Sequence, residues 1–486
     1  MKKSFQTLLF ACIVIAVQGC VPLRKEALPS SDPPLPVKYP VSDGAKSSAL
    51  IGWREYFKDA NLTSLIGTAL QNNQELNILI QEIAVSKAEV LGRKGAIFPF
   101  LTFGSHAGLE KVGRHTRDGA VEDNSTNEIK PGGAIPEPLS DFGFKADFDW
   151  EVDIWRKLRK LRNERDAAIK HYYATQEGRN FMVTNLVAEI AGSYYELLAL
   201  DSQMNILKPM IEVQQSVLEA VKLQKAAAKV TELAVKRFEA EVLKNQSHLF
   251  EVQQQITVTE NRLNFLAGRY PQPIKRNSAG FERLMLSGLH SGLPAELLRN
   301  RPDVKKAELE LAASGLEVKA AAARFYPSLN ISAALGLQSF TFSSAFNTPA
   351  SLIYGTAANV AAPLINRSAI QAAYQGASAR QVSAIYAYQQ TVLKAYVEVV
   401  NQLSQIRNLN QSYERKSEQV KALSDSIAIA AQLFNNARAD YTEVLMTQRD
   451  ALEARIDLVE LKQQQLGAFV KTYKALGGGY NRGTGT

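Results

Sequence analysis

The sequence predicts a mixed α and β membrane protein that is internally duplicated, with long antiparallel helical hairpins and four membrane strands in each chain. Three observations carry this prediction. One stretch alternates apolar and polar residues over twelve positions, as a strand does. Long stretches with almost no loop signal have the apolar spacing of helices. The switch from helix to strand occurs twice, each time at a proline.

The first twenty residues, MKKSFQTLLFACIVIAVQGC, have the features of a secretory signal. Two lysines precede an apolar run too short to remain in a membrane, and a small residue, Gly19, precedes Cys20. This ending resembles the processing site of bacterial lipoproteins, so we expect cleavage before Cys20 and acylation of that residue. The alternative is an ordinary signal with a chance cysteine. If Cys20 is acylated as expected, residues 1–19 are the signal peptide and the proline-rich residues 20–45 form an acylated tether.

The first repeat, residues 46–275, begins with a helical pattern from about Asn61 to Lys94, with Asn61 as the expected cap. Pro99 ends this helix and restricts the preceding residue to extended geometry. Residues 101–109 then alternate between apolar and polar types, which predicts a strand. Residues 110–141 are rich in Gly, Asp, Asn and Pro and predict a long exposed loop.

The clearest strand signal is FGFKADFDWEVD, from Phe142 to Asp153. Period two places only apolar residues on one face and five charged residues on the other. We expect the aromatic face to contact lipid, because membrane strands alternate in this way. The charged face is expected to line water, with Lys145, Asp147, Asp149 and Glu151 as pore-lining residues. The alternative is the polar face of a soluble sheet.

Two long helices are expected after this strand. Residues 155–228 contain almost no loop signal, a break follows near Lys229 to Thr231, and a second helix runs from Glu232 to Leu266. Gly268 is the expected end signal of that second helix. Together the two segments predict a long antiparallel hairpin.

The second repeat, residues 276–480, follows the same plan, and residues 481–486 form a tail. Its expected elements are a helix with Pro302 near its start, strands Leu329–Gln338 and Tyr354–Leu364, a helix over 366–434, a break over 435–440, and a last helix that ends at ALGGGY.

Equivalent features of the two halves have consistent spacings. Gly268 and Gly477 are 209 positions apart, Ile154 and Leu364 are 210 apart, and Pro99 and Pro327 are 228 apart. The first half therefore has 18 or 19 extra residues between its strands (228 minus 210 or 209). An internal duplication with one loop insertion explains all three spacings.

Four strands cannot close a barrel by themselves, since single-chain outer-membrane barrels begin at about eight. Unpaired strand edges are not tolerated in lipid, so other copies of the chain must complete the barrel. We prefer a barrel of twelve strands from three copies. Two copies would supply eight strands, which also reaches the minimum for a closed barrel.

Several motifs resemble one known family in both sequence and order. They include GWREYFKDANLTSLIGTALQNNQEL, DIWRKLRKLRNERDAA, GLPAELLRNRPDVKKAE, DYTEVLMTQRDALEAR and YKALGGGY. The chain resembles the outer-membrane efflux proteins over about residues 50–480. These are TolC-like channels, and the chain resembles specifically their acylated NodT-type subgroup, which serves resistance-nodulation-division pumps.

This resemblance implies a homotrimer with a shared 12-strand β-barrel in the outer membrane of a Gram-negative bacterium. Each chain would be lipid-anchored and would add long helices to an α-helical tunnel in the periplasm. The implied partners are a periplasmic adaptor (membrane fusion) protein, an inner-membrane resistance-nodulation-division transporter and outer-membrane lipid. The transported substrate would be chosen by the pump, and this sequence does not identify it.

The resemblance also implies that the breaks between hairpin helices close the periplasmic end of the tunnel. Asp440 is the first residue of the family pattern DYTEVLMTQR and lies at the second tip, and Arg438 lies just before it. Val230, Thr231 and Glu232 hold the matching place at the first tip. The alternative for each of them is an ordinary solvated loop residue.

No catalytic or metal-binding motif is present. The sequence has no HExxH, no CxxC and no GxxxxGK, and its five histidines lack the spacing of metal ligands. We therefore expect no enzyme activity, no cofactor and no metal site. Without Lys2 and Lys3, 54 basic and 48 acidic residues leave a net charge of +6. Because these charges interleave, nucleic-acid binding is not expected.

Passive efflux through a channel is thus the expected function. One alternative is a non-conducting structural lipoprotein whose hairpins bridge the layers of the envelope. Another is the export channel of a type I protein secretion system.

Overall fold

The computed structural model describes residues 28–30, 35–40, 48–127, 133–154, 159–284, 292–362, 367–436 and 438–479. Cys20 lies outside these ranges. The chain divides into two compact units. The first contains Val85–Tyr172 and Leu309–Ile385, and the second contains Ser30–Ala84, Tyr173–Glu308 and Tyr386–Thr486. Each unit therefore includes residues from both halves of the sequence.

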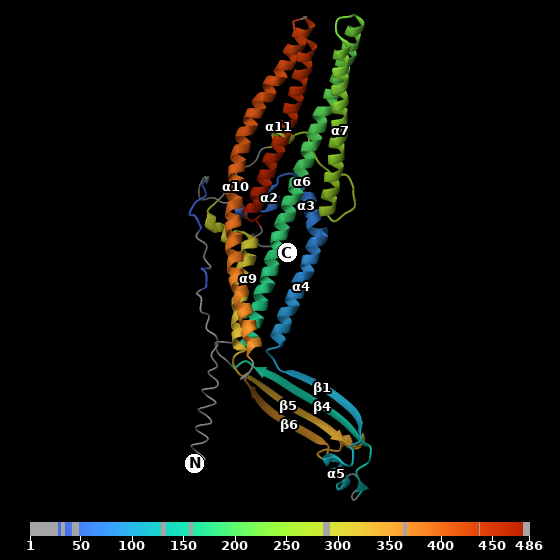
Figure 1. Ribbon diagram of the computed structural model, residues 1–486, viewed down its shortest axis with the longest axis vertical. Helices are drawn as coiled ribbons and strands as arrows, with labels where there is room; N and C mark the ends of the chain where they lie inside the picture. The colour runs from blue at the N-terminus through green and yellow to red at the C-terminus, as the bar shows by residue number, and fades with distance from the viewer. Residues whose placement is uncertain are drawn as a thin grey trace. The chain divides into compact units, whose positions relative to one another are not determined.

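The first unit contains a four-stranded antiparallel sheet in the order β1-β4-β5-β6 (Figure 1). The strands are β1 (Phe100–Glu110), β4 (Leu139–Val152), β5 (Ser328–Ser339) and β6 (Leu352–Ala361). All four strands predicted from residue alternation are thus confirmed. Strand β4 begins three residues earlier than the sequence indicated, and the expected end of the last strand at Leu364 lies outside the described residues.

The expectation of one long loop over 110–141 is only partly right. Helix α5 (Arg117–Asp123) and a short ribbon of β2 (Thr126–Asn127) and β3 (Gly133–Ala134) lie within it. The Thr116 hydroxyl accepts a hydrogen bond from the Gly119 amide at 3.2 Å and so caps α5. This local cap stabilises a helix that the high content of Gly and Asp had argued against.

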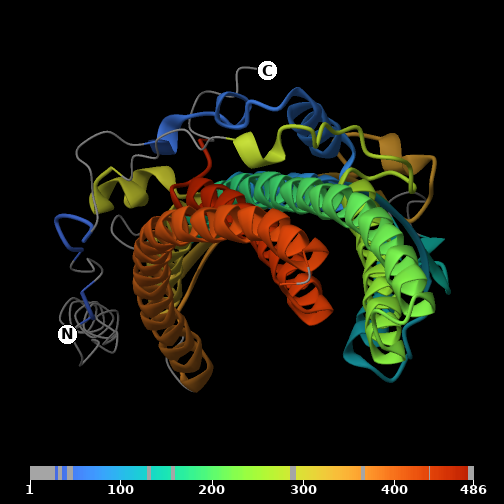
Figure 2. The same cartoon turned by 90° about the horizontal axis from the view of Figure 1, so that it is seen from above.

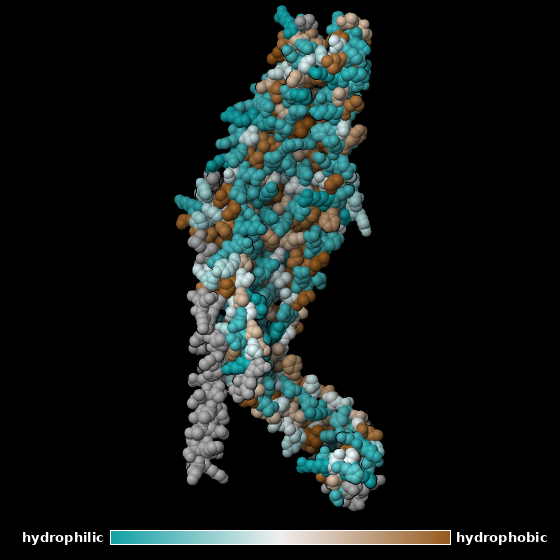
Figure 3. Space-filling model, viewed as in Figure 1, coloured by the Kyte–Doolittle hydropathy of each residue, from teal (hydrophilic) through white to brown (hydrophobic). Residues whose placement is uncertain are grey.

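The predicted hairpins are formed by α6 (Lys160–Ala226) with α7 (Glu232–Leu266) and by α10 (Ser368–Asn435) with α11 (Tyr441–Ala475). They belong to the second unit except for the first parts of α6 and α10, up to Tyr172 and Ile385, which belong to the first. Both breaks fall where the sequence predicted them. Figure 2 shows the two hairpins from above, with α6 and α7 in green and α10 and α11 in orange to red. Their surface in Figure 3 is mainly hydrophilic, as expected of helices in water. None of the described helices is both apolar and long enough to traverse a bilayer.

The remaining elements are short or flank the hairpins. They are η1 (Ser48–Leu50), α2 (Trp53–Tyr56), α3 (Ala60–Asn72), α4 (Gln74–Gly95), η2 (Phe281–Arg283), η3 (Pro294–Glu296), α8 (Leu297–Asn300), α9 (Pro302–Ala323) and η4 (Ser344–Phe346).

The main core of the second unit forms where α2 and α3 pack on α6, α7 and α11. Tyr56 stacks on Phe469 with ring centroids 4.3 Å apart, and its hydroxyl donates a hydrogen bond to the Phe469 carbonyl oxygen at 2.9 Å. Because this hydroxyl is paired, the aromatic ring is buried without an unsatisfied polar atom.

The single helix predicted over Asn61–Lys94 is wrong, because Asn73 divides it into α3 and α4. The Asn73 side chain accepts a hydrogen bond from the Leu76 amide at 2.9 Å and donates one to the Leu266 carbonyl oxygen at 3.0 Å. The predicted cap at Asn61 is also wrong. The Asp59 carboxylate accepts hydrogen bonds from the amides of Asn61 and Leu62, so helix α3 begins earlier.

The same break occurs in the second half, where Arg301 separates α8 from α9 and Pro302 is the first residue of α9. The Arg301 guanidinium donates a hydrogen bond to the Ala475 carbonyl oxygen at 3.0 Å. Arg301 follows Asn73 by 228 positions, and Ala475 follows Leu266 by 209. The two joints therefore share the spacings found in the sequence.

Candidate functional site

The sheet has two chemically different faces. In an antiparallel pair, directly opposed residues lie on the same face. Phe148 is opposed by Leu101 and Ala333, whereas Asp149 is opposed by Phe100 and Ser332. The register extends this separation over the whole sheet, so one face is rich in large apolar side chains. Its members include Leu101, Phe103, Phe142, Phe144, Phe148, Trp150, Ile331, Leu335, Leu337 and Tyr354.

The opposite face carries Lys145, Asp147, Asp149 and Glu151, the residues expected to line a pore. Small residues flank these charges on the neighbouring strands. Lys145 lies between Gly104 and Gly336, and Asp147 lies between Thr102 and Ala334. Because these neighbours are small, the charged groups keep room for water.

Of the three acids expected to line the pore, two are compensated by lysines. Lys145 pairs with Asp147 at 2.7 Å, and Lys160 of α6 pairs with Glu151 at 3.1 Å. Asp149 is exposed and has no ion pair among the described residues. The alternation of the sequence did not reveal this difference, since Lys160 is nine positions from Glu151 and belongs to another element.

Aromatic residues gather toward both ends of β4. Phe144 lies 6.3 Å from Phe342 and 5.5 Å from Phe346 between ring centroids. Toward the other end, the Trp150 indole donates a hydrogen bond to the Ile97 carbonyl oxygen at 3.0 Å. Aromatic girdles at both interfaces are typical of strands that cross a membrane.

The sheet ends in two open edges. Strands β1 and β6 are the outermost strands, and no described strand pairs with their outer edges. Every residue of β1 is exposed. Open edges leave backbone donors and acceptors available for pairing with another chain.

The tip residues of the first hairpin are engaged within the chain. The Thr231 hydroxyl caps α7 by accepting a hydrogen bond from the Ala234 amide at 3.4 Å. Val230 packs against a buried cluster that includes Val221 and Phe238. The ammonium group of Lys225 donates a hydrogen bond to Glu232 and so holds the pKa of that carboxyl below its usual value.

The tip residues of the second hairpin are exposed and less engaged. The backbone amide of Arg438 donates a hydrogen bond to the Leu433 carbonyl oxygen at 2.9 Å, but its guanidinium forms no ion pair within the described ranges. Asp440 precedes α11, and its side chain does not cap that helix but accepts a hydrogen bond from the Thr442 hydroxyl at 3.4 Å. Both charged groups are therefore available to another molecule.

The two hairpins touch near their tips. Tyr441 and Leu445 of α11 pack against the same cluster that holds Val230, which consists of buried residues from α6 and α7. The five predicted tip residues thus belong to one end of the second unit. In the described part of the chain, the charged group at the first tip has an ion pair, whereas those at the second tip have none.

Comparison with known proteins agrees with this architecture. The sequence matches the family described as "Outer membrane efflux protein" over residues 65–269 and 293–478. It is 26% identical over 448 residues to the pyoverdine export outer membrane protein OpmQ of Pseudomonas putida, with 92% of each chain covered. It is 24% identical over 473 residues to the cation efflux system protein CusC of Escherichia coli, with 96% of this chain and 98% of the relative covered.

Solved structures show the same fold. A crystal structure of CusC matches with a TM-score of 0.80 at 23% identity and covers 93% of this chain and 99% of that one. The structure of the open state of the Neisseria gonorrhoeae MtrE channel also matches with a TM-score of 0.80, at 20% identity. This match covers 95% of this chain and 100% of that one. Because the two family segments together span most of the sequence, this chain belongs to the outer membrane efflux protein family.

Proposed function

We propose that this member of the efflux family is the passive channel subunit of a tripartite pump, and that three copies share one barrel. The observation that carries the proposal is the four-stranded sheet with one apolar face, one charged face and two open edges. Three copies would supply twelve strands, which is within the range of known outer-membrane barrels. Pairing of β1 with β6 of the next copy would satisfy both edges.

We also propose that Lys145, Asp147, Asp149 and Glu151 face the water-filled interior of this barrel. A charge facing lipid costs about 2–4 kcal/mol at the bilayer midplane. The face with Phe144, Phe148 and Trp150 therefore suits lipid, and the charged face suits water.

The partners follow from this role. A channel without its own energy source needs a pump, and an adaptor must connect the two across the periplasm. We propose a periplasmic adaptor and an inner-membrane resistance-nodulation-division transporter, with contact at the hairpin tips. Relatives are named for pyoverdine, cations and solvents. Since one fold serves such different cargo, we assign substrate choice to the pump and no catalysis to this chain.

We propose that Cys20 is acylated and holds the chain in the outer membrane. A relative of 23% identity over 479 residues, SilC of Salmonella typhimurium, is described as a probable outer membrane lipoprotein. Mass spectrometry of the mature N-terminus should find an acylated cysteine as the first residue. Detection of unmodified Val21 or of Met1 at the N-terminus would reject this assignment.

Single-channel recording of the purified protein in a planar bilayer tests the channel itself. A conducting species of trimer mass is expected. A trimer that inserts without conducting would favour an envelope-bridging structural lipoprotein instead.

A further inference from the structure

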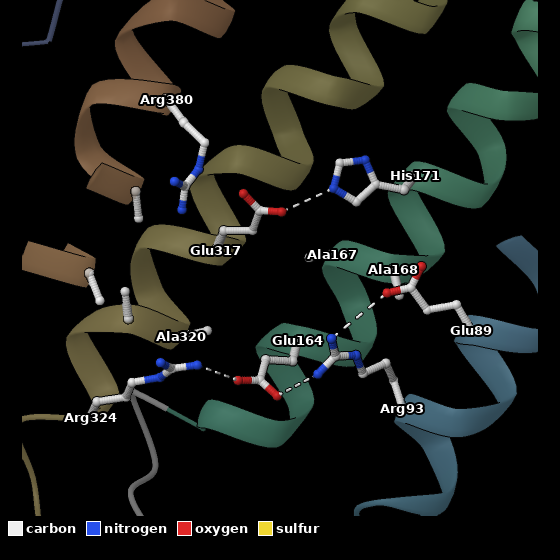
Figure 4. A pocket seen from close by; sticks show the side chains of 13 residues that line it. Glu89, Arg93, Glu164, Ala167, Ala168, His171, Glu317, Ala320, Arg324 and Arg380 are labelled. Carbon is white, nitrogen blue, oxygen red and sulfur yellow. Dashed lines mark hydrogen bonds and ion pairs between the residues drawn. The ribbon is translucent and has the colours of Figure 1, made fainter. Parts of the chain in front are cut away.

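A cavity of about 590 Å³ lies among α4, α6, α9 and α10 within the first unit (Figure 4). Nearly half of its lining consists of alanines contributed by three of these helices. They are Ala167, Ala168, Ala320, Ala321, Ala373 and Ala377. Small side chains at these positions leave open space between the helices, and charged side chains surround that space.

Most of these charges are paired with one another. Glu164 accepts a hydrogen bond from Arg93 at 3.1 Å, and its other oxygen lies 3.7 Å from Arg324. Glu317 is within 3.1 Å of the His171 ring nitrogen. The carboxylates of the cavity therefore already have cationic or hydrogen-bonding partners on the protein.

Arg380 is the exception. It is exposed, and in the described part of the chain its guanidinium has neither a hydrogen bond nor an ion pair. Figure 4 shows this group on the α10 side of the cavity, beside Glu317. Arg324, directly after α9, is the second available cation, since its side chain is 51% exposed and its guanidinium lies 3.7 Å from Glu164.

The cavity adjoins the charged face of the sheet through a shared lining residue, Arg324. Arg324 also lines a second cavity, of about 280 Å³, together with Glu151 and Asn330. Glu151 and Asn330 are directly opposed in the sheet and lie on its charged face. The ion pair between Lys160 and Glu151 links α6 to this face as well. A solute that moves along the charged face would therefore reach the larger cavity.

We infer that this cavity is a binding site for a solute that carries a carboxylate or phosphate group, with Arg380 as its main ligand and Arg324 as the second. A guanidinium binds either oxyanion through two parallel hydrogen bonds. The inference rests on the proposed channel, whose interior would bring solutes to the charged face. Weak binding is what a conduit requires, because a transported solute must also leave.

Two assays on the purified full-length trimer test this site, with citrate as the probe. Calorimetry measures citrate binding without requiring conduction, and single-channel recording measures block of the current by citrate. Arg380→Gln should weaken binding about tenfold or more, since it removes a charged hydrogen-bonding partner. The citrate affinity of Arg380→Lys should lie between those of Arg380→Gln and the wild type. Lysine keeps the positive charge but cannot form the two parallel hydrogen bonds of a guanidinium.

Arg415→Gln is the matched control, because Arg415 is an exposed arginine on the same helix, paired with Glu418 at 2.9 Å. It should bind citrate as the wild type does. Equal citrate binding by wild type and Arg380→Gln would overturn the inference. So would a phospholipid that copurifies with the wild type and is lost in Arg380→Gln, since the oxyanion would then belong to a lipid headgroup. A wild type that binds citrate but never conducts would refute the proposed channel alone.

Discussion

The side-chain amide of Asn73 donates a hydrogen bond to the carbonyl oxygen of Leu266, 193 positions away, at 3.0 Å. This contact ties the break between α3 and α4 to the last turn of α7. Arg301 makes the equivalent contact with Ala475 at the end of α11. Each hairpin is therefore fixed at its base by a polar side chain that also interrupts a helix.

Asn73→Ala should destabilise the second unit. It leaves the Leu76 amide and the Leu266 carbonyl oxygen without these partners in a buried place. Each unpaired buried group costs about 1–3 kcal/mol. The thermal unfolding midpoint in detergent, followed by circular dichroism, should fall. The neighbouring exposed residue Gln71 provides the control, and Gln71→Ala should leave the midpoint nearly unchanged.

Gly268→Ala should impair folding more strongly. Gly268 has a φ of 67°, and a Cβ there would overlap the carbonyl oxygen of Asn72. Gly477 has a φ of 109°, and a Cβ added there would likewise overlap the carbonyl oxygen of Asn300. Gly467→Ala is the control, because Gly467 is helical with no neighbour within 4 Å of a new Cβ, and alanine there should be neutral or stabilising. The yield of folded protein decides between these outcomes, and equal yields of Gly268→Ala and Gly467→Ala would contradict the prediction.

Asp149→Asn should weaken the preference of the channel for cations, because Asp149 is the acid without an ion pair among those expected to line the pore. The double variant Lys145→Gln with Asp147→Asn removes a neutral pair and should change selectivity little. Reversal potentials in a salt gradient at low ionic strength measure both effects, since screening is weakest there. A larger shift in the double variant would show that pairing does not set the local potential.

Phe148→Arg should prevent insertion, because it places a charge on the face that we propose contacts lipid, at a cost of about 2–4 kcal/mol near the bilayer midplane. Asp149→Arg should insert and shift selectivity toward anions. The amount of trimer extracted from outer membranes measures insertion. Insertion of Phe148→Arg together with failure of Asp149→Arg would mean that the two faces are reversed.

At the tips, Arg438→Ala should raise the resting conductance, and Asp440→Ala should weaken cation selectivity. Neither group has an ion pair among the described residues, so we expect them to act between copies. Glu232→Gln is the internal comparison, because Lys225 already compensates that carboxylate. Single-channel currents that are unchanged in the Arg438 and Asp440 variants would identify these residues as ordinary solvated loop positions.

Lys462→Met should stabilise the second hairpin. Lys462 is 8% exposed, its ammonium lies 5.2 Å from the centroid of the Tyr413 ring, and burial lowers its pKa below the usual value. Since the folded state disfavours the charged form, wild-type stability should rise with pH between the lowered pKa and the usual lysine value. Lys462→Met should lose this pH dependence and unfold at a higher temperature. A lower midpoint for Lys462→Met would mean that the contact with Tyr413 outweighs the cost of burial.

The sequence by itself determined the features that depend on neighbouring residues. The alternation in FGFKADFDWEVD assigned each residue to a face of β4, because side chains of a strand alternate whatever the strand pairs with. The sequence also predicted the breaks near Thr231 and Asp440, since long helical patterns stop there. The recurring prolines and glycines predicted the repeat, and the same spacing separates Asn73 and Arg301.

Tertiary structure decided what depends on residues far apart in the chain. Asn73 interrupts a favourable helical pattern because its partner Leu266 is brought beside it by folding. Arg380 is left without a partner while Arg93 and Arg324 share Glu164, although no local pattern distinguishes the three arginines. Pairing energies of this kind depend on distances in space, and a single sequence contains the residues of each pair but not the distance between them.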